Sequence, residues 1–280
     1  MAVSPLAPAA FPALPEIGGV RFSSVAAGVR YRNRTDVMLA LLAPGTTVAG
    51  CFTRSAPRSA PVRDCEAKMG GAPDGAAAIL VNSGNSNAFT GAAGERSVAA
   101  ICAATADRLG IAAARVFTSS TGVIGEPLPH ERIVAALDGL AEGLSADGIE
   151  PAARAIMTTD TFPKGAAAQV EIDGKTVSIA GIAKGSGMIA PDMATMLVYI
   201  FTDAKIAQSD LQTLVSEINE KTFNSITVDS DTSTSDTLLV AATGASDVTV
   251  TPQDAAFRDG LHHVMQDLAH QVVRDGEGAQ

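Results

Sequence analysis

Tryptophan is absent from this 280-residue sequence, and aromatic residues make up only 4% of it. Hydrophobic residues nevertheless reach 46% and charged residues 18%, a balance that is typical of folded rather than disordered chains. We therefore expect a core of alanine, valine, isoleucine and leucine, in one large domain or two smaller ones.

Positive charge is also scarce, with 20 lysines and arginines against 30 acidic residues and a formal net charge of −10. No cluster of basic residues is present, so we exclude a nucleic-acid partner, and the charge argues against an anionic membrane surface. The central apolar run at 193–201 is too short to cross a bilayer, and the proline-broken N-terminus lacks the basic start of a secretory signal. The sequence predicts a cytoplasmic protein with no membrane partner.

Cysteine is rare as well, and its three positions show no CxxC spacing: Cys51, Cys65 and Cys102. Such a count predicts reduced thiols in a cytosolic protein. Asp229, Asp231 and Ser233 have the spacing of a calcium loop, but Val240 stands where that loop needs glutamate. We therefore expect no metal site, and we expect these polar residues to line a cleft or a strand connection instead.

Short β-like runs alternate with longer helical patterns along the chain. Strands are predicted at 76–83, 169–173, 175–182, 196–203 and 236–244. Helices are predicted at 94–109, 129–143, 209–223 and 252–274. This alternation predicts an α/β (α+β) fold in which mixed sheets form a layered sandwich covered by helices.

Local signals refine the ends of these elements. The Asp-Gly pair at 173–174 predicts a hairpin turn between two strands. Ser209 and Gln212 have the spacing of a capping box. Thr251 before Pro252 predicts an N-cap followed by proline at the first helical position.

The segment 183–197 carries the most chemical information. Residues 185–190 match a dinucleotide-binding pattern by letter, but Pro191 follows at once where that pattern needs a helix, so we reject a dinucleotide site. If the bond before Thr195 broke, Thr195 would gain a free α-amine beside its own hydroxyl, and that amine could serve as its general base. Taken alone, the local sequence favours an ordinary strand start.

The run KGSGMIAPDMATML resembles the autocleavage segment of the ornithine acetyltransferase (glutamate N-acetyltransferase) family of arginine biosynthesis. Five other motifs resemble this family in the same order: VNSGNSNAFTG, STGVIG, MTTDTFPK, ITVDSDTSTSDT and VRDGEGA. The resemblance implies a proenzyme that cuts itself between Ala194 and Thr195. It also implies an α chain (1–194) and a β chain (195–280) that associate as a heterotetramer of two α and two β chains, with a fold like that of self-processing amidohydrolases.

The resemblance also implies roles for single residues. Thr195 is the nucleophile that carries an acetyl group from N-acetylornithine to glutamate, and Thr121 and Gly122 form the oxyanion hole. The substrate contacts fall on Thr158, Lys184, Thr195 and Glu277. No cofactor is implied, although some members of the family use acetyl-coenzyme A as a second acetyl donor.

The match is incomplete at two places. The β chain of the family runs well beyond the residue that matches Gln280, so we expect this chain to be shortened at its C-terminus. Ser230 and Ser235 stand where the family usually has glycine and asparagine. Two alternatives stay open: a related self-processing aminopeptidase or amidohydrolase, in which water takes the acyl group, and an inactive, truncated partner subunit.

Overall fold

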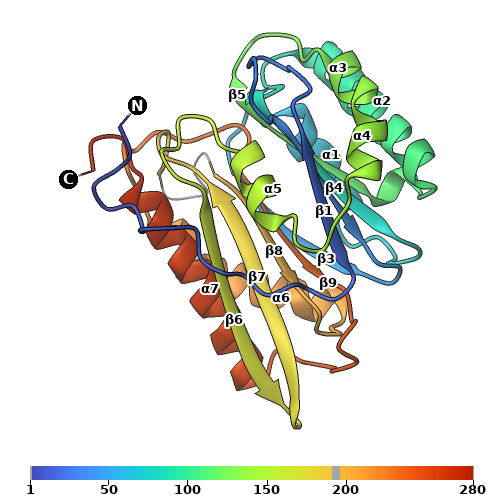
Figure 1. The fold of residues 1–280 in the computed structure, drawn as a ribbon, viewed down its shortest axis with the longest axis vertical. Helices are drawn as coiled ribbons and strands as arrows, with labels where there is room; N and C mark the ends of the chain where they lie inside the picture. The colour runs from blue at the N-terminus through green and yellow to red at the C-terminus, as the bar shows by residue number, and fades with distance from the viewer. Residues whose placement is uncertain (1, 191–195, 280) are drawn as a thin grey trace.

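The computed structural model describes residues 2–190 and 196–279, in which two β-sheets lie between layers of helices (Figure 1). The first sheet has the order β1-β2-β4-β5, formed by Val20–Val25, Val37–Leu42, Ala77–Asn85 and Val116–Val123. The second has the order β3-β9-β8-β7-β6, formed by Thr47–Phe52, Thr237–Ala242, Leu197–Thr202, Lys175–Lys184 and Lys164–Ile172. Both are mixed: β4 and β5 pair in parallel, as do β8 and β9, and the other neighbours are antiparallel.

Helices cover the outer faces of both sheets. Those around the first sheet are α1 (Ala60–Lys68), α2 (Gly91–Leu109), α3 (His130–Ala135) and α4 (Leu137–Glu142). Those on the second are α6 (Gln208–Asn219) and α7 (Ala255–Arg274), whereas α5 (Ile149–Ala155) contacts strands of both sheets. The described residues also form two short 3₁₀ turns, η1 (Ala113–Arg115) and η2 (Phe223–Ser225). No helix in the described part of the chain is long and apolar enough to cross a membrane.

Strand β8 shows how the sandwich is filled. Tyr199 and Phe201 point into the core between the two sheets, where the Phe201 ring meets Phe22 of β1 edge-on with ring centres 5.0 Å apart. Val198 and Ile200 point to the other face and pack with the cluster beneath α6 and α7. Such alternation follows from the two-residue period of a strand, and each fully buried side chain of this size contributes about 1.5–3 kcal/mol.

The α/β prediction is confirmed, and each of the five predicted strands overlaps an observed one: β4, β6, β7, β8 and β9. The turn at 173–174 joins β6 to β7, with φ of 52° at Asp173 and 74° at Gly174. Both residues are therefore in the left-handed region that a tight two-residue hairpin requires.

The predicted capping box is wrong. Helix α6 begins at Gln208, so Ser209 lies inside its first turn, and no side chain caps it. Gln212 instead bonds strand β3, because its amide accepts from the Gly50 N–H at 3.0 Å and donates to the Gly50 carbonyl at 2.9 Å. A tertiary contact has taken the side chain that a local cap would have used.

The predicted cap at Thr251 is also wrong. Helix α7 begins at Ala255, with Asp254 at its N-cap position, and the Thr251 N–H and hydroxyl both donate to the Asp254 carboxylate. The single helix predicted at 129–143 is two helices, α3 and α4, which meet at Ala136. The helix predicted at 209–223 ends at Asn219.

Candidate active site

A polar pocket of about 450 Å³ lies where the ends of β5 and β7 meet several loops. Five of the residues implicated by the family resemblance line it: Thr121, Gly122, Thr158, Lys184 and Glu277. They come from four separate sequence motifs, so the fold brings together what the sequence separates. Ala194 and Thr195 lie outside the described residues, and the roles of all seven stay predictions.

The Thr121-Gly122 turn is set by the parallel pairing of β4 and β5. Gly84 pairs with Gly122, and the register shifts at the next residue. Gly122 has a φ of 128°, and a Cβ there would lie 2.3 Å from the carbonyl carbon of Gly84. Only glycine fits this position, because the backbone angle disfavours other residues and no space exists for a side chain.

Lys184 ends β7 and reaches across to this turn. Its ammonium donates a hydrogen bond to the Thr121 Oγ1 at 3.2 Å, and both side chains are buried. An ammonium has hydrogens and no lone pair, so the Thr121 oxygen must accept and its own hydrogen must point elsewhere. The arrangement leaves the Thr121 hydroxyl free to donate to a ligand.

Asp160 is the carboxylate that acts most strongly on Lys184. Burial lowers the pKa of Lys184, and the nearby Asp160 carboxylate opposes this effect, leaving the pKa below its ordinary value of 10.5. Burial alone would raise the pKa of Asp160, but Lys164 and Lys184 outweigh it and hold that pKa below its ordinary value of 3.8. Asp160 is therefore a buried carboxylate between two ammonium groups.

Met196, the residue after Thr195, is hydrogen-bonded where the parallel pairing of β8 with β9 begins. The Met196 N–H donates to the Asp236 Oδ1 at 3.1 Å, and the Thr237 N–H donates to the Met196 carbonyl at 3.1 Å. Asp236 is fully buried, and this burial raises its pKa well above 3.8. Its position ties the motif 227–236 to the residue after the predicted nucleophile.

The expected polar lining of a cleft or strand connection is confirmed. Asp229 and Asp231 line the pocket, and Ser233 is buried in the connection that leads to β9. Asp229 accepts from the backbone N–H groups of Met188 and Ile189 at 2.5 and 2.8 Å, which fixes the loop after β7. Within the described ranges 2–190 and 196–279, no group of three His, Cys, Asp or Glu side chains could hold a metal ion.

Two lining residues lie outside all of the sequence motifs. Arg30 and Tyr31 come from the loop between β1 and β2 and lie on the pocket wall. Arg30 forms an ion pair with Glu126 at 2.7 Å, and Arg34 stacks over the Tyr31 ring at 4.3 Å. Their segment, RYRN, carries no recognisable motif, and only the tertiary fold connects it to the pocket.

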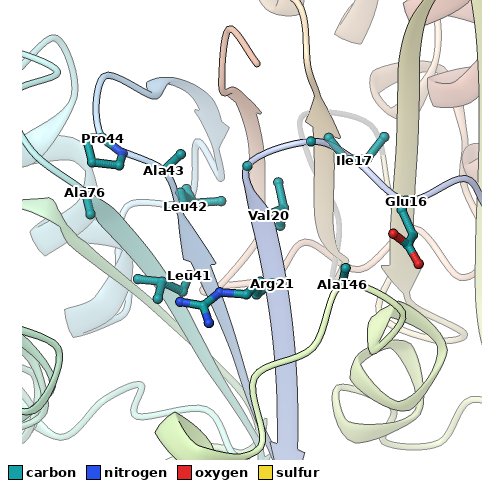
Figure 2. Close-up of a pocket in the computed structure, with 12 residues that line it drawn as sticks. Glu16, Ile17, Val20, Arg21, Leu41, Leu42, Ala43, Pro44, Ala76 and Ala146 are labelled. Carbon is teal, nitrogen blue, oxygen red and sulfur yellow. The ribbon is translucent and has the colours of Figure 1, made fainter. Parts of the chain in front are cut away.

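A larger cavity of about 690 Å³ lies beside β1 and β2 (Figure 2). None of the five predicted site residues that the structure describes lines it. Its charged lining residues are Glu16, from the segment before β1, and Arg21, from β1, and aliphatic side chains and backbone form the rest. Ligand sites need polar groups that converge on one point, so the smaller pocket is the better candidate.

Comparison with known proteins identifies relatives of the whole chain. Residues 21–280 match the model of the ArgJ family. The arginine biosynthesis bifunctional protein ArgJ of Ruegeria pomeroyi is 70% identical over 99% of this chain and 68% of its own length. The corresponding protein of Rhizobium meliloti is 52% identical over 99% of this chain and 69% of its own length.

Two solved structures are similar to this chain. The ornithine acetyltransferase of Mycobacterium tuberculosis, solved in complex with ornithine, has 32% sequence identity and a TM-score of 0.55, covering 62% of this chain and 92% of that one. An L-aminopeptidase D-Ala-esterase/amidase from Ochrobactrum anthropi, described as a variant of the Ntn-hydrolase fold, has a TM-score of 0.54. It covers 96% of this chain and 87% of that one at 14% identity, so it shares the fold alone.

Proposed function

The chain belongs to the ArgJ family, and on that premise we propose that it is an acetyltransferase of arginine biosynthesis that moves an acetyl group from N-acetylornithine to glutamate. Acetyl-coenzyme A is a second acetyl donor in this proposal, and the enzyme works in the cytoplasm. The reaction needs a nucleophile, a base and donors for an oxyanion.

Self-cleavage comes first. The Thr195 hydroxyl attacks the carbonyl carbon of Ala194, and the acyl group moves from nitrogen to oxygen as the peptide bond breaks. This shift frees the α-amine of Thr195. Water then hydrolyses the resulting ester, which releases the Ala194 carboxylate and restores the Thr195 hydroxyl. This amine takes the proton of the neighbouring hydroxyl in the later reaction, so the cut creates the general base.

Acetyl transfer then uses the same hydroxyl. Thr195 attacks the acetyl carbonyl of N-acetylornithine, the Thr121 hydroxyl and the Gly122 N–H stabilise the oxyanion, and ornithine leaves with the proton. The amine of glutamate attacks the acetyl ester and regenerates Thr195. Thr158, Lys184 and Glu277 hold the amino acids.

One observation carries the proposal: five implicated residues from distant parts of the chain line a single pocket, in which Lys184 bonds Thr121. The Lys184 bond matters most, because it directs the hydrogen of Thr121 away from lysine and toward a ligand. A chance grouping of loop residues would not supply an oriented donor next to a glycine turn that accepts no side chain.

The sheet order supports two chains that stay associated after the cut. Strands β8 and β9 follow the predicted cleavage point, yet they lie between β3 and β7, which precede it. The pairs β3–β9 and β7–β8 are both antiparallel, and their hydrogen bonds join the α chain to the β chain. Helix α7 of the β chain also packs on β6 and β7, so the cut need not open the core. We propose that such αβ units pair into a heterotetramer.

Intact mass and N-terminal sequencing of the purified protein test the cut, and we expect chains 1–194 and 195–280. Incubation with N-acetylornithine, with and without glutamate, tests the transfer. Fast ornithine release that requires glutamate supports the transferase, whereas release without glutamate identifies an amidohydrolase or aminopeptidase. One uncut chain that releases no ornithine would leave the non-catalytic partner subunit as the better explanation.

A further inference from the structure

A buried ion network lies directly behind the pocket. The Lys164 ammonium is 2.8 Å from the Asp160 Oδ1 and 2.6 Å from the Asp275 Oδ2, and all three side chains are fully buried. Lys184, also buried, adds a second ammonium near Asp160. Two positive and two negative groups therefore balance, as a buried cluster of charges requires.

The network holds the backbone of the loop 157–163. The Asp160 Oδ2 accepts from the Thr158 N–H at 2.9 Å. The N–H of Thr161, the residue after Asp160, donates to the Asp275 carboxylate at 2.9 Å. Thr158 is one of the predicted substrate contacts, and Asp160 fixes its amide.

The same two carboxylates reach the other substrate loops. The Asp160 Oδ1 accepts from the Gly185 N–H at 2.6 Å, immediately after Lys184. Asp275 stands two residues before Glu277, whose own N–H donates to the Ser186 carbonyl at 2.8 Å. The network therefore connects the three segments that carry Thr158, Lys184 and Glu277, although none of its three members lines the pocket.

We propose that Asp160, Lys164 and Asp275 are positioning residues that fix the three substrate-binding segments relative to one another, an inference that rests on the proposed function. The ammonium of Lys164 joins two carboxylates. Asp160 holds the backbone amides of Thr158 and Gly185, and Asp275 holds that of Thr161 in the same loop as Thr158. Loss of one charge-assisted bond should loosen one segment against the others.

A merely stabilising role makes a different kinetic prediction. If the network only kept the protein folded, its loss would lower the fraction of active molecules, and therefore kcat, at an unchanged KM. Misplaced binding groups weaken substrate binding in every folded molecule and raise KM. The ratio of the two effects separates the explanations.

Asp275→Asn is the test variant, because asparagine has the same shape and can still accept from the Thr161 N–H while the charge beside Lys164 is lost. Asp64→Asn is the matched control. Asp64 pairs with Lys68 at 2.5 Å with the same four-residue spacing as Asp160 and Lys164, but on α1, away from the pocket. Thermal melting of both variants verifies that they fold.

Amide hydrogen–deuterium exchange on the full chain gives a readout that requires no turnover. We expect Asp275→Asn to speed exchange across 184–188 by about tenfold or more, the usual weight of a hydrogen bond to a charged group, while Asp64→Asn leaves this segment unchanged. Exchange in this segment that stays at the wild-type rate in Asp275→Asn would overturn the positioning role, whether or not the protein transfers acetyl groups.

Steady-state kinetics gives the second readout. The KM for N-acetylornithine should rise about tenfold in Asp275→Asn with a smaller change in kcat, and should not change in Asp64→Asn. A fall in kcat at constant KM would contradict the inference and leave the proposed function intact. Wild-type protein that transfers no acetyl group would contradict the proposed function, and the exchange experiment would still decide the positioning role.

Discussion

The hydroxyl of Thr121 is the group whose loss should affect catalysis most specifically among the described residues. It is buried, accepts from the Lys184 ammonium at 3.2 Å, and sits beside a glycine that tolerates no side chain. Thr121→Ala removes this donor with little change in volume, and Thr121→Ser keeps the oxygen. The two variants together test the hydroxyl rather than the methyl group.

Two terms set the expected magnitude. Removing one oxyanion donor typically lowers kcat by about 10²–10³, or about 2.7–4 kcal/mol of transition-state stabilisation. The same change leaves the buried Lys184 ammonium short of an acceptor, which costs about 1–3 kcal/mol of folding stability. We therefore expect kcat to fall at least about a hundredfold, KM to stay close to wild type, and the melting temperature to drop by several degrees.

Lys184 provides an internal check. If its role toward Thr121 is to direct the hydroxyl, Lys184→Met should lower kcat in the wild-type background and have a much smaller effect on kcat in Thr121→Ala. Such non-additivity is the expected sign of two residues that act through one interaction. The effect of Lys184→Met on KM should be the same with Thr121 and with Thr121→Ala, because the predicted substrate contact of Lys184 does not depend on Thr121.

Initial rates of ornithine release at saturating N-acetylornithine and glutamate measure these values, with thermal melting and intact mass recorded for each variant. Rates are normalised to the cleaved fraction, because self-cleavage passes through a similar oxyanion and is also expected to slow. An unchanged kcat in cleaved Thr121→Ala would show that the turn is only a structural loop. Additive effects of the two substitutions would refute the orientation argument.

Three further predictions follow from single positions. Thr195→Ala should leave one uncut, folded chain by intact mass, and Thr195→Ser should still cut; normal processing of Thr195→Ala would show that the nucleophile is another residue. Gly122→Ala should unfold or inactivate the protein, because its Cβ would lie 2.3 Å from Gly84; a wild-type melting curve and rate would contradict this. The pKa of Asp160 is lowered in the folded state, so its stabilisation is present above pH 3.8 and is lost as pH falls further; Asp160→Asn should flatten the acid limb of a plot of unfolding free energy against pH, and an unchanged slope would refute this.

The second sheet was largely predictable because its strands carry local signals. Its hairpin at 173–174 needs two left-handed residues, and the Asp-Gly pair supplies them. Strand β3 of this sheet was not predicted, since Gly50 interrupts its apolar run. The order of the strands could not be predicted from the sequence, because it depends on pairings such as that of Thr47 with Ala242, 195 residues apart.

The residues of the pocket were also only partly predictable from the sequence. Resemblance to a family identified Thr158 and Lys184, because their motifs are long and unusual. It did not identify Lys164, although this residue lies inside the same motif as Thr158, because a lysine in a loop is usually solvated and only tertiary structure shows its full burial. The pocket residues with predicted ligand contacts therefore carried a sequence signal, whereas the buried residues behind the pocket carried none.

The charges that remain in the pocket indicate which end of a substrate lies where. Lys184 is turned toward Thr121, and the Asp229 carboxylate is occupied by backbone N–H groups, so neither is fully available to a ligand. The carboxylates of Asp231 and Glu277 also line the pocket. Within the described part of the chain, no group donates a hydrogen bond to either of them. Two carboxylates that accept from no group of residues 2–190 and 196–279 favour a cationic ligand group. The ammonium of an ornithine side chain meets this requirement, and we expect it to bind on the Glu277 side of the pocket, with the acetyl group toward the Thr121 turn.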